Sequence, residues 1–281
     1  MHTYALAPQL TDEYIETVWE TLPRHLRPTL LLPSPTLSDR LGCELTIASE
    51  AFQYTGSFKF RAAYNLLASI PQSHVIAASS GNYGQAVAYA SKLLNKTCTI
   101  VMPDTSARVK IAAVQAYGGV VDLVDVKKSS RAERVAALRQ ARPDAFEAKA
   151  YDDYRVVAGN STLGAEILRA GHFDTIVVPV GGGGLSSGII IARDYLHAQT
   201  QIIGAEPLPG NDAARSLQSG QLISNTQEPP TIADGARTIS LGQLNWEIVK
   251  QGLADIIEVP DALTLQALRT YFLYANLKVE P

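Results

Sequence analysis

The sequence has 281 residues, a length that predicts one large domain or two interleaved ones. Hydrophobic residues make up 46% of the chain and charged residues 18%, so a sizeable core can form. A net charge of −3, with acids and bases mixed along the chain, argues against nucleic-acid-binding proteins. No apolar run approaches the roughly 18 residues that span a bilayer, and the chain start lacks the features of a signal peptide. We therefore expect neither a nucleic-acid nor a membrane partner.

The two cysteines, Cys43 and Cys98, lie far apart in the sequence, each in an apolar run. This pattern predicts buried free thiols rather than a disulfide. Free thiols are typical of a reducing compartment, so we expect a cytoplasmic protein.

Short β-branched apolar runs alternate with segments of helical period along the chain. The predicted strands are Glu44–Ala48, His74–Ala78, Cys98–Met102, Val120–Val124, Thr175–Val180 and Gln201–Ala205. The clearest predicted helices are Ala86–Leu94, Val109–Tyr117, Ala132–Arg139, Leu163–Arg169 and Leu185–Tyr195. This alternation predicts an α/β fold with parallel sheets. We expect the proline-rich segment Thr21–Pro35 to be a wrapping arm and the polar segment Ser219–Pro230 to be a loop.

The first segment that could carry chemistry surrounds Lys59. Thr55 or Ser57 can cap a helix that continues to Ile70, which would place Lys59 in its first turn. The positive end of the helix dipole and two flanking phenylalanines would lower the pKa of the amine, as a Schiff-base lysine requires. A solvated lysine on an amphipathic helix is the alternative.

A small polar loop follows the strand His74–Ala78 and opens a helix, at residues Ser79, Ser80, Gly81 and Asn82. The α/β sheets of many proteins bind ligands at such a position, and glycine allows close approach of the backbone. A helix cap with a glycine turn is the alternative interpretation.

A run of four glycines follows the strand Thr175–Val180, at Gly181, Gly182, Gly183 and Gly184. Successive backbone N–H groups at the start of a helix can hold an anion. The spacing matches neither a dinucleotide nor a nucleoside-triphosphate motif, so a monophosphate fits better. A flexible surface loop is the alternative.

Glu206 and Asp212 flank a turn that contains Gly210. Two carboxylates with help from a backbone carbonyl could bind a hard divalent cation such as Mg²⁺. An ordinary acidic turn is the alternative.

Taken in order, these segments resemble the fold-type II pyridoxal-phosphate enzymes, in the branch of threonine and serine dehydratases and serine racemase. The resemblance covers about Thr11 to Pro281. It is carried by four motifs: Ser57–Arg61, Ser79–Asn82, Pro179–Leu185 and Thr231–Gly235.

The resemblance implies a role for each matching residue. Lys59 would hold pyridoxal 5'-phosphate as a Schiff base and later move protons at the substrate Cα. Asn82 would bind the ring oxygen of the cofactor, and Gly181 to Gly184 would bind its phosphate. Ser79, Ser80, Gly81 and Asn82 would receive the substrate carboxylate, with Ser80 at the position of the racemase's second acid/base. Glu206, the Gly210 carbonyl and Asp212 would match the branch's divalent-cation site.

The implied architecture has two α/β domains, similar to the β-subunit of tryptophan synthase. Residues 1–72 and 149–281 would form the large cofactor-binding domain, and residues 73–148 the small one. The family implies a homodimer. It also continues past the position of Pro281, so we expect a C-terminal end that is truncated relative to the family.

The implied activity is dehydration and deamination of L-threonine or L-serine to a 2-oxo acid and ammonia. A serine racemase and a catalytically impaired pyridoxal-phosphate-binding homologue are the alternatives. One departure from the family pattern, Ser161 in place of a glycine, predicts an added Cβ near the cofactor edge and a change in substrate choice.

Overall fold

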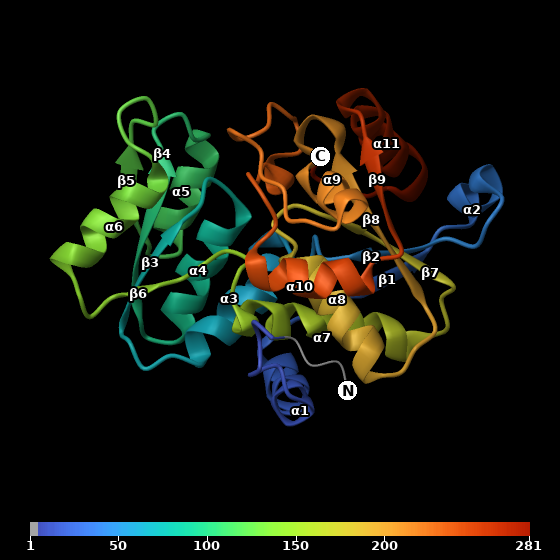
Figure 1. Ribbon diagram of the computed structural model, residues 1–281, viewed down its shortest axis with the longest axis horizontal. Helices are drawn as coiled ribbons and strands as arrows, with labels where there is room; N and C mark the ends of the chain where they lie inside the picture. The colour runs from blue at the N-terminus through green and yellow to red at the C-terminus, as the bar shows by residue number, and fades with distance from the viewer. Residues whose placement is uncertain (1–4) are drawn as a thin grey trace.

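Two parallel sheets form the frame of the protein in a computed structural model that describes residues 5–281 (Figure 1). One sheet has the strand order β5-β4-β3-β6 and the other the order β7-β8-β9. All neighbouring strands within these two sheets run parallel, which confirms the predicted α/β fold. The first four residues, on which part of the signal-peptide prediction rests, lie outside the described residues.

The four-stranded sheet and its helices form the lobe at the left of Figure 1. Its strands are β3 (His74–Ala78), β4 (Thr97–Pro103), β5 (Val120–Val124) and β6 (Phe146–Glu147). Its helices are α4 (Asn82–Leu93), α5 (Arg108–Ala116) and α6 (Arg131–Ala141). The apolar run of β3 is almost fully buried, as expected of a central strand in a sheet that helices cover.

The three-stranded sheet belongs to the other lobe. Its strands are β7 (Thr175–Pro179), β8 (Gln201–Pro207) and β9 (Asp255–Val259). The surrounding helices are α7 (Tyr154–Ala170), α8 (Gly184–Tyr195), α9 (Asp212–Ser219), α10 (Gln243–Gly252) and α11 (Asp261–Ala275). One hydrophobic core cluster contains residues from both sheets and from α3 (Lys59–Ala68), α7 and α8, so the two lobes share buried side chains.

The N-terminal part of the chain packs on this frame. It contains α1 (Asp12–Thr21), β1 (Leu30–Pro33), α2 (Pro35–Leu41), β2 (Thr46–Ser49) and α3 (Lys59–Ala68). The prediction of an irregular arm over Thr21–Pro35 is wrong, because a 3₁₀ turn (Leu22–His25) and the strand β1 lie within it. Proline fits both elements, since it is tolerated in the first turn of a helix and in an edge strand.

Helix α7 begins well before the predicted start at Leu163. The Asp153 side chain caps it by accepting a hydrogen bond from the Arg155 N–H, 2.9 Å away. Small residues interrupt its apolar period, and they allow neighbouring helices to approach. A Cβ added at Gly164, for example, would lie 2.6 Å from the Ala192 Cβ of α8.

Both cysteines are free, but only Cys98 is buried. The prediction of burial is wrong for Cys43, because it follows Gly42, whose left-handed conformation ends α2 at the surface. Within residues 5–281 no helix has the length and apolar character needed to cross a membrane.

Candidate active site

Lys59 is the first residue of α3, as the sequence predicts, but the predicted cap is wrong. The N-cap is Phe58, which makes no side-chain capping bond. Thr55 has a left-handed backbone (φ 61°) and Ser57 an extended one. Their hydroxyl oxygens are buried without a hydrogen-bond partner in the described chain.

The Lys59 side chain is half-buried, and its Nζ lies 4.7 Å from the centre of the Phe58 ring. Burial lowers the pKa of Lys59 to about 8. Near neutral pH, part of this amine is therefore unprotonated, the form that attacks a carbonyl group.

Helix α7 joins the first turn of α3 to the glycine run. A Cβ added at Gly159 would lie 2.6 Å from the Arg61 carbonyl oxygen, so α3 packs directly on this position. The next residue, Asn160, donates a hydrogen bond from Nδ2 to the Gly184 carbonyl oxygen at 3.0 Å. These two consecutive α7 residues therefore contact the start of α3 and the start of α8.

The glycine run is an ordered turn between β7 and α8. Gly183 has a left-handed backbone (φ 87°), and a Cβ there would lie 2.8 Å from the Asn245 Cβ. Among the described residues, no hydrogen bond uses the backbone N–H groups of residues 181–184. The first N–H after them that binds a carbonyl is that of Ser187, which donates to the Gly183 oxygen. Free N–H groups at a helix start suit a phosphate, and the flexible-loop alternative does not fit this packing.

The Ser79 hydroxyl shapes the second loop. Its Oγ accepts hydrogen bonds from the N–H groups of Gly81 (3.2 Å) and Gly84 (2.9 Å), at the start of α4. Ser80 is only half-buried and its side chain makes no hydrogen bond within the described residues, which leaves it available to a ligand. Binding of the substrate carboxylate by this loop stays a prediction.

Asn82 opens α4, and its Nδ2 donates a hydrogen bond to the Glu280 carboxylate at 2.6 Å. The predicted contact with a cofactor ring oxygen would compete with Glu280 for the same amide group. That contact also stays a prediction.

The segment 234–236 lies between the two loops, in the orange chain that runs between the lobes (Figure 1). A Cβ added at Gly81 would lie 3.5 Å from Asp234 Oδ2, and one at Gly181 would lie 3.0 Å from the Ala236 Cα. The Ser79–Asn82 loop and the glycine run therefore approach the same short segment from different lobes.

A group of charged side chains at this junction was not predicted from the sequence. It contains three cations and two carboxylates, from Lys110, Arg131, Arg237, Asp234 and Glu228. Lys110 pairs with Asp234, and its Nζ would lie 3.7 Å from a Cβ at Gly81. The cations come from α5, α6 and the segment after residue 236, so no sequence spacing connects them.

Glu206 and Asp212 are both buried, with 2% and 1% of their surfaces exposed. Burial raises the pKa of Glu206 to about 8 and that of Asp212 to about 7. The Glu206 carboxylate accepts from two N–H groups of α9, whereas Oδ2 of Asp212 has no partner. Residues 5–281 contain no cluster of three or more His, Cys, Asp or Glu side chains that could hold a metal. A cation here would therefore also need the Gly210 carbonyl or water, and the site stays a prediction.

Ser161 does not direct its hydroxyl toward the candidate site. Its Oγ accepts a hydrogen bond from Trp19 Nε1 at 2.8 Å and donates to the Ala158 carbonyl at 2.7 Å. The hydroxyl therefore fastens α1 to α7, and its predicted effect on substrate choice gains no support from this geometry.

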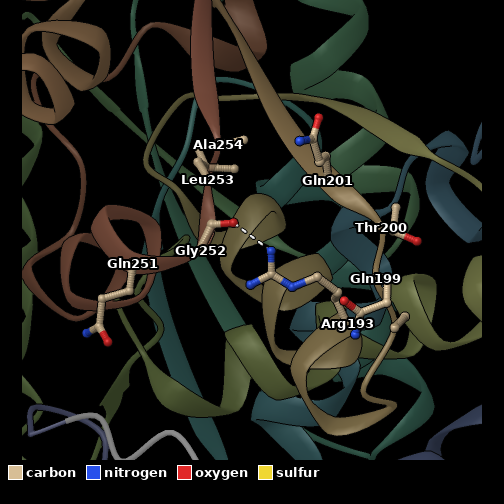
Figure 2. A pocket seen from close by; sticks show the side chains of 9 residues that line it. Arg193, Gln199, Thr200, Gln201, Gln251, Gly252, Leu253 and Ala254 are labelled. Carbon is tan, nitrogen blue, oxygen red and sulfur yellow. Dashed lines mark hydrogen bonds between the residues drawn. The ribbon is translucent and has the colours of Figure 1, made fainter.

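A pocket of about 340 Å³ lies elsewhere in the molecule, and Figure 2 shows the side chains that line it. Arg193 lies in its wall and donates a hydrogen bond to the Gly252 carbonyl at 2.9 Å. Other lining residues, such as Gln201 and Ala254, lie at the amino ends of β8 and β9. Parallel sheets bind ligands at the carboxyl ends of their strands, so this cavity is not the candidate active site.

Known proteins resemble this chain over most of its length. The family described as pyridoxal-phosphate dependent enzyme matches residues 22–281. The L-threo-3-hydroxyaspartate ammonia-lyase of Saccharomyces cerevisiae is 36% identical over 260 residues, 91% of this chain and 78% of that protein. The serine racemase of Schizosaccharomyces pombe is 33% identical over 276 residues, 96% of this chain and 85% of that protein.

Solved structures of related enzymes also resemble this chain over most of its length. The threonine deaminase of T.th. superposes with a TM-score of 0.89 at 35% identity, over 95% of this chain and 88% of that one. Maize serine racemase superposes with a TM-score of 0.91 at 30% identity, over 95% of this chain and 82% of that one. These matches confirm the fold-type II resemblance, and pyridoxal phosphate is the cofactor that the lysine and the glycine run fit. The chain belongs to the family of pyridoxal-phosphate dependent enzymes.

Proposed function

We propose that this chain is an ammonia-lyase that converts a β-hydroxy amino acid to a 2-oxo acid and ammonia. The observation that carries the proposal is the position of Lys59. The first turn of its helix packs on Gly159 of α7, and the next α7 residue, Asn160, binds the Gly184 carbonyl of the glycine run. Family members similar to this chain include ammonia-lyases and racemases of amino acids.

The side chains of this site have distinct tasks in the proposed reaction. Pyridoxal phosphate, when bound, withdraws electrons from the bond that breaks at the substrate Cα. The neutral amine of Lys59 takes up the Cα proton at Nζ, which its lowered pKa permits. The N–H groups of residues 181–184 hold the phosphate, and the 79–82 loop orients the substrate carboxylate. Loss of hydroxide from Cβ leaves an enamine, which hydrolyses to the 2-oxo acid and ammonia.

Among β-hydroxy amino acids, L-serine and L-threonine are the substrates that the sequence resemblance implies. The charged group at the junction favours a third substrate, L-threo-3-hydroxyaspartate, which carries a second carboxylate. Three of these five side chains are cations and two are carboxylates, and the Glu280 carboxylate on Asn82 adds a third negative charge to the same loop. Lys110 approaches Gly81 in the loop proposed to hold the substrate. Relatives from Saccharomyces cerevisiae and Pseudomonas sp carry the name L-threo-3-hydroxyaspartate ammonia-lyase.

A substrate panel tests the proposal. The purified protein with pyridoxal phosphate is given L-serine, L-threonine or L-threo-3-hydroxyaspartate, and the 2-oxo acid and the chirality of the remaining amino acid are followed. We expect kcat/KM for the hydroxyaspartate to exceed that for L-serine by about tenfold, which corresponds to about 1.4 kcal/mol of added interaction. Lys110→Met should remove most of that preference.

Other outcomes of the panel would contradict the proposal. Formation of D-serine without pyruvate would identify a racemase. Binding of the cofactor without turnover of any panel member would identify an impaired homologue. A Lys59→Ala variant that still held the cofactor covalently would refute the assignment of the lysine.

The division into domains 1–72 with 149–281 and 73–148, the homodimer and the cytoplasmic location are further proposals. They are supported by family resemblance and by the free cysteines.

A further inference from the structure

We infer that Asn160 and Asn245 are positioning residues that aim the N–H groups of Gly183 and Leu185, in and directly after the glycine run, at the cofactor phosphate. The inference rests on the cofactor site and not on which substrate is used. Both asparagines lie outside the motifs that the sequence resemblance picks out.

Asn245 lies on α10 and is fully buried. Its Nδ2 donates hydrogen bonds to the carbonyl oxygens of Gly182, at 2.7 Å, and Tyr151, at 3.0 Å. The N–H of Gly242 donates to the same Gly182 oxygen at 3.1 Å. Two donors from the start of α10 therefore fix the direction of the Gly182 carbonyl.

Asn160 plays the equivalent part from the other side. It lies on α7 with 1% of its surface exposed, and its Nδ2 donates to the Gly184 carbonyl oxygen at 3.0 Å. The carbonyls on either side of Gly183 are thus held by two different helices.

Peptide planarity converts these contacts into a direction for the N–H groups. In a trans peptide unit the C=O of one residue and the N–H of the next point to opposite sides. When the Gly182 carbonyl points to α10, the Gly183 N–H points away from α10. When the Gly184 carbonyl points to α7, the Leu185 N–H points away from α7. Neither N–H binds an acceptor within the described residues, so both are available to an anion.

The amide groups fit this role because only their donor ends are used. The Oδ1 atoms of Asn160 and Asn245 are buried and have no hydrogen-bond partner in the described chain. The groups that the amides face are carbonyl oxygens, which can only accept, so the NH₂ end must face the glycine run. Without these anchors a run of four glycines would have more conformational freedom than any other sequence.

The test distinguishes a specific effect on phosphate binding from a general effect on the stability of the fold. Asn160→Leu and Asn245→Leu keep the branching at Cγ and remove the donor. Asn65→Leu is the matched control. Asn65 lies on α3, is also buried (7% exposed), and also donates a hydrogen bond to a backbone carbonyl, that of Arg155 on α7 at 2.8 Å. It makes no contact with the glycine run in that hydrogen bond. The apoprotein of each variant is titrated with pyridoxal phosphate and with pyridoxal, which has the aldehyde but no phosphate, and its thermal unfolding is recorded.

We expect each test variant to bind pyridoxal phosphate about tenfold more weakly, with pyridoxal affinity changed less than about twofold. Asn65→Leu should leave the ratio of the two affinities unchanged. If a leucine variant does not fold, the corresponding alanine variant, which also removes the donor without adding charge, takes its place. An unchanged ratio in both test variants, or an equal change in the control, would overturn the inference. Because these readouts are binding constants, they are independent of whether the proposed lyase reaction occurs.

Discussion

Replacing Gly183 by alanine tests whether the glycine run is a phosphate-binding site whose backbone is fixed by the surrounding packing. Its backbone is left-handed (φ 87°), a conformation in which a Cβ costs about 1–2 kcal/mol. The added Cβ would also lie 2.8 Å from the Asn245 Cβ and 2.9 Å from Leu241 Cδ2. Such overpacking costs about 1–3 kcal/mol more. The sum, about 2–5 kcal/mol, is a large part of the 5–15 kcal/mol that stabilises a typical domain.

The assay compares Gly183→Ala with Gly220→Ala. Gly220 also has a left-handed backbone (φ 72°), but nothing lies within 4 Å of an added Cβ. The control therefore carries the backbone cost without the packing cost. We expect urea unfolding of the apoprotein to show a loss for Gly183→Ala that exceeds the control's loss by about 1–3 kcal/mol, together with weaker binding of pyridoxal phosphate. Equal losses and unchanged cofactor binding would refute the reasoning.

Three further predictions concern other parts of the site. Capture of pyridoxal by Lys59 should accelerate as the pH rises through about 8, because the lowered pKa makes the amine neutral above that value; a profile without a step between pH 7 and 9 would contradict the burial effect. Arg61→Met should lower the free energy of unfolding in urea by about 3–5 kcal/mol, because it removes the fully buried guanidinium that pairs with the mostly buried Glu50, at 2.7 Å, and with the partly exposed Glu166. Mg²⁺ or Ca²⁺ should raise the melting temperature of the protein but not that of Asp212→Asn, since binding to the folded state alone stabilises it; an equal shift in both would place the cation elsewhere.

The fold could be predicted where local pattern and burial agree. The strands His74–Ala78 and Val120–Val124 have the predicted bounds, because β-branched runs there end at polar or glycine residues. The start of α7 could not be predicted, since Gly159, Ser161 and Gly164 break the apolar period. The two glycines are required by the neighbouring helices α3 and α8, and that requirement exists only in the tertiary structure.

The same division holds for the candidate site. The order of the motifs around Lys59 and the glycine run was enough to predict the family. The prediction of a helix cap at Thr55 or Ser57 was wrong, because the chain before α3 has a left-handed residue, Thr55. Lys110 and Arg131 lie on two helices of the lobe with the four-stranded sheet, and nothing in the sequence spacing links them to their partners, Asp234 and Glu228.

The position of α7 explains why the site depends on residues with no chemistry of their own. In the proposed site a cofactor would be held covalently at Lys59 and by hydrogen bonds at the glycine run, so its affinity would depend on the distance between these two points. That distance is set on α7, where Gly159 touches the Lys59 turn and Asn160 holds the start of α8. A misplacement of about 1 Å can reduce a rate about 10²-fold. The close packing that hides the start of α7 from sequence patterns is therefore the same packing by which α7 contacts both of the proposed attachment points.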